Sequence, residues 1–202
     1  MPASSALLAE TMEPCDGDLM ARVARGDRVA FAGVVERHKR SLVAYLGRLT
    51  GNRDRAEELA QEAFVRLFQS AASYRDEGRL LPYLFRIGTN LLRSEERRRR
   101  RWQLLQPLFA GGLFADGRGE QPARPGEEAV LRDELQRRVR RELAALPLRF
   151  RVPLVLFEVE EWSYADIAGV LGCREGTVKS RIHRGRDRLR RALEPYLTEG
   201  SR

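Results

Sequence analysis

Apolar residues recur at three- and four-residue spacing along most of this 202-residue chain, and this helical period limits its fold more than any other feature. The period runs from Gly17 to Trp102, resumes near Glu128 and continues to Leu197. No segment keeps the strict alternation of a half-buried β-strand. The sequence therefore predicts an all-α protein.

A break in the pattern divides the two helical stretches into separate domains. Residues 103–127 hold five glycines and three prolines, which favour a loop over a packed helix. We predict a flexible tail at residues 1–16, a first helical domain at 17–102, a flexible linker at 103–128 and a second helical domain at 129–197. The linker contacts either a partner or the protein's own domains through its apolar residues, which are Leu104, Leu105, Leu108, Phe109, Leu113 and Phe114.

The chain carries a large excess of positive charge. Its 37 Lys and Arg residues outnumber its 29 Asp and Glu residues, which gives a net charge of +8. This excess predicts a polyanionic partner, either nucleic acid or an anionic membrane surface. Only Lys39 and Lys179 are lysines, so nearly all of the charge is guanidinium, which suits bidentate contacts with phosphate and guanine. Codon bias in a GC-rich genome would produce the same excess of arginine.

Groups that could carry catalysis or hold a metal ion are few. Cys15 and Cys173 are far apart, and with only His38 and His183 beside them no metal-ligand spacing or disulfide framework is present. No glycine-rich phosphate loop, nucleophile with a base or pair of carboxylates is recognisable. We predict a protein that is not an enzyme and has no cofactor, metal or small-molecule substrate. The sequence shows neither a signal peptide nor about 20 consecutive apolar residues, so we expect it in the cytoplasm.

A helix-turn-helix is predicted near the C-terminal end. Ser163 stands three residues before Asp166, a variant of the capping box that begins a helix. Gly172 follows this short helix and supplies the backbone freedom for a sharp turn. A second helix then places Val178 and Ile182 on a packed side and leaves a basic side free.

The free side of that second helix predicts binding to duplex DNA. Between Arg174 and Arg191, eight Lys or Arg residues stand against two acidic residues. In such a motif the N-terminal residues of the second helix contact base edges in the major groove, and outlying cations hold phosphates. A solvated amphipathic hairpin is the alternative. The residues predicted to contact DNA are Arg174, Thr177, Lys179, Ser180, Arg181 and Arg184.

An acidic helix face in the first domain predicts a protein partner. The segment 54–69 places Ala56, Leu59, Ala60, Ala63 and Leu67 on one side of a helix and acidic residues on the other. Acidic groups do not favour DNA phosphates, so this face meets either a protein or only solvent. The residues predicted to bind a partner are Asp54, Glu58, Gln61 and Glu62.

Aromatic and arginine residues are interleaved over residues 81–102. Tyr83, Phe85 and Trp102 alternate with single arginines and with an unbroken arginine run at 97–101. Aromatic rings stack on unpaired bases while guanidinium groups follow the backbone, so the segment predicts contact with single-stranded DNA. Core packing is the alternative for Tyr83 and Phe85.

Three of these segments resemble the extracytoplasmic-function group of the sigma-70 family, the specificity subunits of bacterial RNA polymerase. Residues 176–181, Gly-Thr-Val-Lys-Ser-Arg, are similar to the family's fourth conserved region, whose helix-turn-helix reads the minus-35 promoter element. Residues 58–64, Glu-Leu-Ala-Gln-Glu-Ala-Phe, are similar to the part of the second region that binds the coiled coil of the polymerase β′ subunit. Residues 83–90, Tyr-Leu-Phe-Arg-Ile-Gly-Thr-Asn, resemble the promoter-melting segment, which engages the minus-10 element.

The resemblance implies a sigma factor that directs core RNA polymerase to promoters, reading the minus-35 duplex and recognising and melting the minus-10 element. It implies three partners, which are core polymerase, promoter DNA and an anti-sigma factor. It assigns the minus-10 contacts to Tyr83, Arg86, Asn90, Arg97 and Arg98. The alternative is an autonomous helix-turn-helix transcription regulator, which would leave the acidic face without a role.

Several residues depart from the family's usual pattern. Glu58 replaces the usual Asp and keeps its charge. Arg174 stands where Ser or Pro is common, and Tyr83 stands where Trp is common, so both changes bear on which bases are read. Gly185 and Gly88 each stand where Ala is common. At Gly185 the change predicts a loss of helix stability of about 1 kcal/mol relative to alanine.

Overall fold

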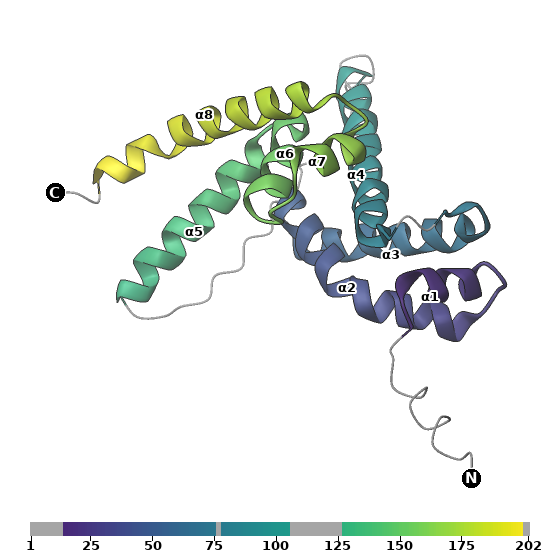
Figure 1. Cartoon of the computed structure of the whole chain (residues 1–202). Coiled ribbons are helices and arrows are strands. Elements are labelled where there is room, and N and C mark those ends of the chain that lie inside the picture. The colour runs from purple at the N-terminus through teal and green to yellow at the C-terminus, as the bar shows by residue number, and fades with distance from the viewer. Residues whose placement is uncertain (1–13, 76–77, 106–126, 200–202) are drawn as a thin grey trace, which may run out of the picture.

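The computed structural model describes residues 14–75, 78–105 and 127–199, and within these ranges it contains helices and no strand. The all-α prediction is confirmed for this part of the chain (Figure 1). The helices are α1 (Asp16–Val23), α2 (Arg28–Thr50), α3 (Arg53–Gln69), α4 (Leu80–Leu105), α5 (Glu127–Ala145), α6 (Leu148–Glu158), α7 (Tyr164–Leu171) and α8 (Glu175–Glu199), with a short 3-10 turn η1 (Ala71–Ser73) before α4. The predicted linker lies mostly outside the described residues.

Local capping explains where the helices of the first domain (α1–α4) begin and end. The Asp27 carboxylate accepts hydrogen bonds from the amides of Val29 and Ala30, at 2.9 and 3.0 Å, and so begins α2. Gly51 ends α2 in the left-handed conformation, with φ of 69°. Asn52 then caps α3 through a 2.9 Å bond from the Arg55 amide. The turn at Gly51 and Asn52 thereby folds α3 back on α2.

The core of the first domain joins α2 to α4 through a stacked aromatic pair. The rings of Tyr45 and Phe85 lie 4.1 Å apart and nearly parallel, and both side chains are fully buried. The Tyr45 hydroxyl shares a 2.7 Å hydrogen bond with Thr89, and burial raises the pKa of this tyrosine above its usual range. Of the two alternatives for Phe85, contact with unpaired DNA or core packing, the structure shows core packing.

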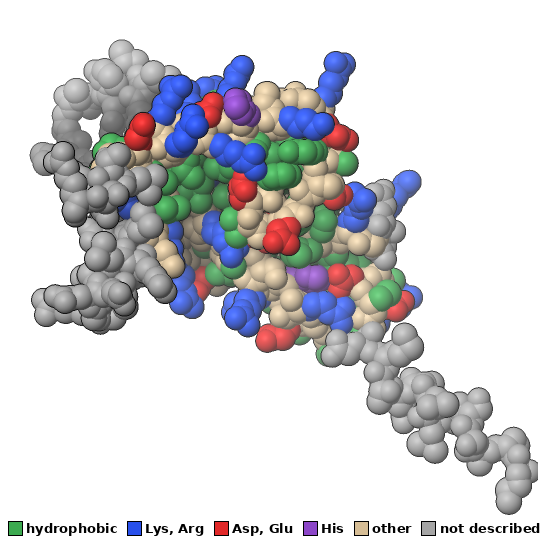
Figure 2. Space-filling view, turned by 60° about the vertical axis from the view of Figure 1, so that its left-hand side comes forward, with side chains coloured by type: hydrophobic (Ala, Val, Ile, Leu, Met, Phe, Trp, Pro, Cys, Tyr) green, Lys and Arg blue, Asp and Glu red, His purple; other side chains and the backbone are tan. Residues whose placement is uncertain are grey.

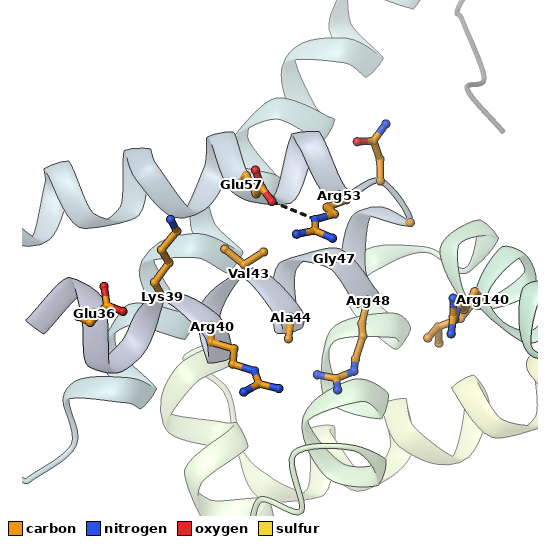
Figure 3. A pocket seen from close by; sticks show the side chains of 13 residues that line it. Glu36, Lys39, Arg40, Val43, Ala44, Gly47, Arg48, Arg53, Glu57 and Arg140 are labelled. Atoms are coloured by element: carbon orange, nitrogen blue, oxygen red, sulfur yellow. Dashed lines mark hydrogen bonds and ion pairs between the residues drawn. The ribbon is translucent and has the colours of Figure 1, made fainter. Parts of the chain in front are cut away.

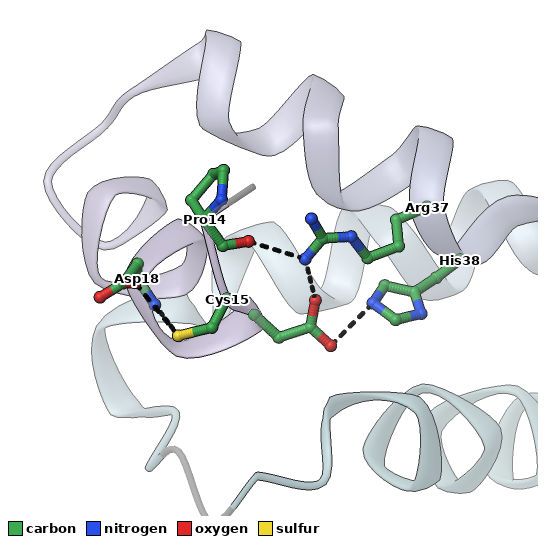
Figure 4. A network of polar contacts seen from close by, with 6 residues as sticks. Pro14, Cys15, Asp18, Arg37 and His38 are labelled. Atoms are coloured by element: carbon green, nitrogen blue, oxygen red, sulfur yellow. Dashed lines mark hydrogen bonds and ion pairs between the residues drawn. The ribbon is translucent and has the colours of Figure 1, made fainter. Parts of the chain in front are cut away.

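A polar network attaches the start of α1 to α2 (Figure 4). The Arg37 guanidinium donates to Asp16 at 2.8 Å and to the Pro14 carbonyl at 3.0 Å. The ring of the buried His38 lies 3.0 Å from the other oxygen of Asp16. Burial opposes ionisation of Asp16, but the hydrogen bonds from Arg37 and His38 outweigh it and lower the pKa of this carboxyl.

The second domain (α5–α8) is built around α6, whose residues from Leu148 to Leu156 are mostly buried. The sequence predicts helix breaks at Pro147 and Pro153, and the second of these is wrong. Pro147 does precede α6, but Pro153 lies inside this helix. Burial of Pro153 with its neighbours, against α7 and α8, stabilises a helix that lacks one backbone hydrogen bond.

The two domains pack on each other around the guanidinium of Arg151, which is only 9% exposed. This group hydrogen-bonds to the carbonyls of Leu146 and Ala144 at the end of α5 and to the carbonyl of Leu49 near the end of α2. Burial lowers the pKa of Arg151 to about 10, so the group stays charged at pH 7. One cation thus joins α2 of the first domain to α5 and α6 of the second.

An aromatic pair and two ion pairs also cross between the domains. The Trp162 ring stacks on Phe85 at 5.2 Å, Arg48 pairs with Glu160 at 2.7 Å, and Arg79 pairs with Asp166 at 2.8 Å. Figure 1 shows the resulting arrangement, with α7 beside α4.

We expect Arg151→Met to lower the free energy of unfolding by about 2–4 kcal/mol, because it leaves buried carbonyls without donors. Urea denaturation measures this change. Arg149→Met is the matched control, since Arg149 is exposed on the same helix, and it should change stability by less than about 0.5 kcal/mol. Equal effects of the two substitutions would contradict the role of Arg151.

Asp16 should make stability depend on pH in the acid range. Because folding lowers the Asp16 pKa below the ordinary aspartate value of 3.8, the contribution of Asp16 to stability is complete at neutral pH and is lost as the pH falls through the lower folded value. Asp16→Asn should therefore cost about 1 kcal/mol at pH 7, and the difference from wild type should shrink as the pH falls below 3.8. Asp18→Asn, which removes an exposed carboxylate of the same helix, controls for net charge.

Candidate nucleic-acid interface

The helix-turn-helix forms as the sequence predicts. The Ser163 hydroxyl accepts a 3.1 Å hydrogen bond from the Asp166 amide and donates a 2.6 Å bond to the Asp166 carboxylate, which begins α7. Gly172 ends α7 in the left-handed conformation, with φ of 62°. After Cys173 and Arg174, α8 begins at Glu175. The tight turn fixes the direction in which the second helix leaves the first.

One side of α8 packs on α6 and the other is free. Val178 and Ile182 are buried, as predicted. A β-carbon added at Gly185 would lie 3.4 Å from the Phe150 carbonyl oxygen, so α8 passes close to α6 at this point. A methyl group at 185 would therefore reach van der Waals contact with α6 without overlapping it.

The residues predicted to contact duplex DNA lie at the start of α8 and differ in exposure. Arg174, Lys179, Ser180 and Arg184 are exposed, while Thr177 and Arg181 are half-buried. Lys179 lies over the Tyr164 ring at 5.2 Å, and Arg181 lies 3.8 Å from the Cys173 sulfur. Figure 2 shows Lys and Arg side chains along the upper part of the molecule, where α8 runs.

The residues predicted to contact unpaired DNA follow α4 from its first turn. The Arg86 guanidinium lies 5.0 Å from the ring centre of the half-buried Tyr83. Asn90, Arg97 and Arg98 are exposed further along the helix. The structure brings Tyr83 and Arg86 together at one end, while Arg97 and Arg98 lie about three turns away.

A cavity of about 390 Å³ opens beside Tyr83 and includes residues that the sequence analysis missed. The Tyr74 ring lies 5.3 Å from the Tyr83 ring, and Arg75 and Arg79 also line the cavity. Tyr74, Arg75 and Arg79 lie close together in the sequence, and this cluster could have indicated that the loop contacts DNA. Rings and guanidinium groups around a hollow suit an unpaired base and its phosphates.

The acidic face of α3 has the predicted division into two sides. Ala56, Leu59, Ala60, Ala63 and Leu67 are all buried, and Asp54, Glu58, Gln61 and Glu62 are all exposed. Two of the acids have basic neighbours on the same helix, since Glu58 pairs with Arg55 and Glu62 pairs with Arg66 at 2.9 Å. Val65 and Phe68 continue this face as exposed apolar side chains. The face therefore combines acidic groups with exposed apolar side chains.

A larger cavity, of about 700 Å³, lies between α2, α3 and α5 (Figure 3). Lys39, Arg40 and Arg48 line it together with apolar residues such as Val43 and Leu143. None of the residues predicted to bind DNA or a protein lines this cavity.

Two further properties hold for the ranges that the structure describes. They contain no group of three or more His, Cys, Asp or Glu side chains that could hold a metal ion. They also contain no helix long and apolar enough to cross a lipid bilayer.

Comparison with known proteins decides between the alternatives that the sequence leaves open. Residues 34–102 match Sigma-70 region 2, and residues 136–189 match Sigma-70, region 4. The RNA polymerase sigma-H factor of Pseudomonas aeruginosa is 32% identical over 186 residues, which cover 91% of this chain and 96% of that protein. The ECF RNA polymerase sigma factor SigW of Bacillus subtilis is 34% identical over 174 residues, which cover 85% of this chain and 93% of that protein. This chain belongs to the extracytoplasmic-function group of the sigma-70 family.

Solved sigma factors share its fold. The sigma factor RpoE of Bartonella quintana, in complex with the anti-sigma factor NepR, is similar with a TM-score of 0.63 and 27% identity, over 81% of this chain and 96% of that one. CnrH, in complex with the cytosolic domain of CnrY, gives a TM-score of 0.63 and 25% identity, over 90% and 99% of the two chains. In the present sigma factor, the region 2 match spans α2 to α4 and the region 4 match runs from α5 into α8.

The two glycines that replace the family's usual alanine should respond differently to Gly→Ala substitution. At Gly185 the added methyl group fits at van der Waals distance, so Gly185→Ala should stabilise this sigma factor by about 0.5–1 kcal/mol through helix propensity. At Gly88 it would lie 3.1 Å from a methyl carbon of the fully buried Leu46, so Gly88→Ala should destabilise by about 1 kcal/mol. Thermal denaturation measures both effects, and a gain at Gly88 would show that Leu46 can move.

Proposed function

We propose that this sigma factor directs core RNA polymerase to promoters through three separate surfaces. The start of α8 reads the minus-35 duplex, the Tyr83 end of α4 captures unpaired minus-10 DNA, and the acidic face of α3 docks on core polymerase. The observation that carries the proposal is that both DNA-binding surfaces and the acidic face occur on one chain that matches regions 2 and 4 of the family.

Duplex recognition is assigned to the exposed side of α8. Lys179, Ser180 and Arg184 stand in the first three turns of the helix with their side chains exposed, where a recognition helix contacts base edges. Arg174 precedes the helix and is placed for a phosphate. Thr177 and Arg181 are half-buried, so we assign them contacts with DNA at the edge of the exposed side of α8.

Melting is assigned to the cavity beside Tyr83. Unstacking a base step costs a few kcal/mol, and a site that holds the extruded base shifts the equilibrium towards open DNA. Tyr74 and Tyr83 offer rings for stacking, and Arg75, Arg79 and Arg86 offer charge for the backbone. Asn90, Arg97 and Arg98 extend this charged and polar path along α4.

Docking on core polymerase is assigned to Asp54, Glu58, Gln61 and Glu62, with the β′ coiled coil as the expected partner. The matched relatives are both named as sigma factors of RNA polymerase, which supports this partner. An autonomous regulator would explain α8 but not the exposed acidic and apolar face of α3. Phosphoryl transfer then belongs to the polymerase, this chain needs no catalytic group of its own, and its place of action is the cytoplasm.

An anti-sigma factor is a further expected partner. The sigma factor RpoE was solved with the anti-sigma factor NepR bound, and CnrH was solved with the cytosolic domain of CnrY bound. The similarity extends over most of this chain, so we infer that it too is held inactive by a protein of that kind. The predicted linker remains a candidate contact for that protein or for the polymerase.

We expect the wild-type protein, added to purified core polymerase, to start transcription from a promoter it recognises, and a Glu58→Arg, Glu62→Arg double variant to fail. Charge reversal on two central positions of the docking face should weaken core binding at least about tenfold. Run-off transcription and co-migration with core polymerase on gel filtration are the two measurements.

The control for that experiment is a Glu36→Arg, Glu142→Arg double variant, which makes the same charge change on α2 and α5. It should bind core polymerase and support transcription like the wild type. If the wild-type protein binds DNA but never forms a complex with core polymerase, the function is that of an autonomous regulator.

A further inference from the structure

We propose that the cavity between α2, α3 and α5 binds an organic polyphosphate, a small molecule that carries two or more linked phosphate groups on a ring portion with apolar surface. A nucleoside triphosphate is a simple member of this class. The cavity is separate from the three surfaces of the proposed function, because none of their residues lines it. An experiment on this cavity therefore tests the proposal independently of promoter recognition.

Positively charged side chains dominate the wall of this cavity. Five cations line it against two acids, and the cations come from three helices, with Lys39, Arg40 and Arg48 on α2, Arg53 at the start of α3 and Arg140 on α5. Several guanidinium groups around one space suit linked phosphates, because each guanidinium donates parallel hydrogen bonds to phosphate oxygens. A ligand with a single carboxylate would leave most of these donors unused.

Three of the five cations are not neutralised within the described part of the chain. Lys39 and Arg40 form no hydrogen bond or ion pair with other described residues, and Arg140 bonds there only to the neutral side chain of Gln136, at 3.3 Å. All three cationic side chains are exposed. The other two arginines each pair with one glutamate. A ligand can therefore engage three cations without first breaking an ion pair.

Apolar groups form another part of the wall. Figure 3 shows Val43 and Ala44 on α2 between Arg40 and Arg48, and Leu143 adds a third apolar side chain from α5. Val43 and Leu143 are half-buried, so each still has apolar surface in contact with water. A ring placed against these groups removes that surface from water, which favours binding. Inorganic polyphosphate has no such portion, so the wall predicts a preference for the organic form.

The size and position of the cavity also favour a small molecule. Its volume of about 700 Å³ lies within the range of about 300–1,000 Å³ that is typical of small-molecule sites. Residues of both domains line it, since Arg140 and Leu143 belong to α5 and the others to α2, α3 and the turn between them. A ligand in contact with both domains binds this folded arrangement and not the unfolded chain. It should therefore raise the thermal unfolding temperature.

The test is the binding of a fluorescent adenosine triphosphate analogue to the full chain, followed by anisotropy in about 0.15 M salt, where weak surface attraction is screened. We expect saturable binding of one analogue per chain. Unlabelled adenosine triphosphate should displace it at concentrations at least about fivefold lower than inorganic tripolyphosphate, and adenosine should not displace it in the same range. Adenosine triphosphate at about ten times its Kd should raise the unfolding temperature by roughly 3 °C.

Variants of the cavity wall locate the site. Arg40→Gln, Arg140→Gln removes one available cation from each domain and should weaken binding of the triphosphate at least about tenfold. Arg28→Gln, Arg149→Gln is the matched control, because it removes one exposed arginine from each domain outside the cavity, and it should change affinity less than about twofold. Glu36→Gln should tighten binding about two- to threefold, since it removes a carboxylate from the wall.

Four results would overturn the proposal. The first is the absence of saturable binding to the wild type. The second is equal weakening by the cavity variant and its control, which would show only a general attraction of anions to a basic protein. The third is equal affinity for adenosine triphosphate and tripolyphosphate, because the apolar wall would then contribute nothing. The fourth is displacement of the analogue by a duplex oligonucleotide from the wild type more readily than by the triphosphate, which would assign the cavity to DNA.

Discussion

The arrangement of the two domains depends on one buried cation. The Arg151 guanidinium satisfies carbonyls at Leu49, Ala144 and Leu146, close to the ends of α2 and α5, where the unpaired carbonyls of a helix carry partial negative charge. Few other side chains could serve three such groups, because only arginine presents several donors in a fixed plane. Arg151 holds the two domains together. In the same arrangement Trp162 stacks on Phe85 and α7 packs on α4.

Much of the fold and of the interface could be predicted from the sequence because the signals are local. The buried and exposed sides of α3 follow from helical spacing, and the start and end of α7 follow from Ser163 and Gly172. The free basic side of α8 follows from the same spacing. In each case the deciding interactions join residues within one or two helical turns, so sequence order is a good guide to neighbours.

The remaining features depend on residues that are distant along the chain. Arg151 and Leu49 are 102 positions apart, and Arg79 and Asp166 are 87 positions apart. No period or cap indicates such pairs, and an arginine in a chain with so many of them gives no sign of being the buried one. The predicted break at Pro153 is wrong for the same reason, since the tolerance of this proline within α6 comes from the core around it.

Asp166 serves two structural purposes at once. Its amide and carboxylate bond with Ser163 to begin the first helix of the DNA-reading motif, and the same carboxylate pairs with an arginine of the other domain. A substitution of Asp166 therefore changes both the cap of α7 and the ion pair with Arg79. A lineage that replaced this aspartate to favour release of the domains would also alter the start of α7, so drift at this position should be accompanied by compensating change at Ser163 or Arg79.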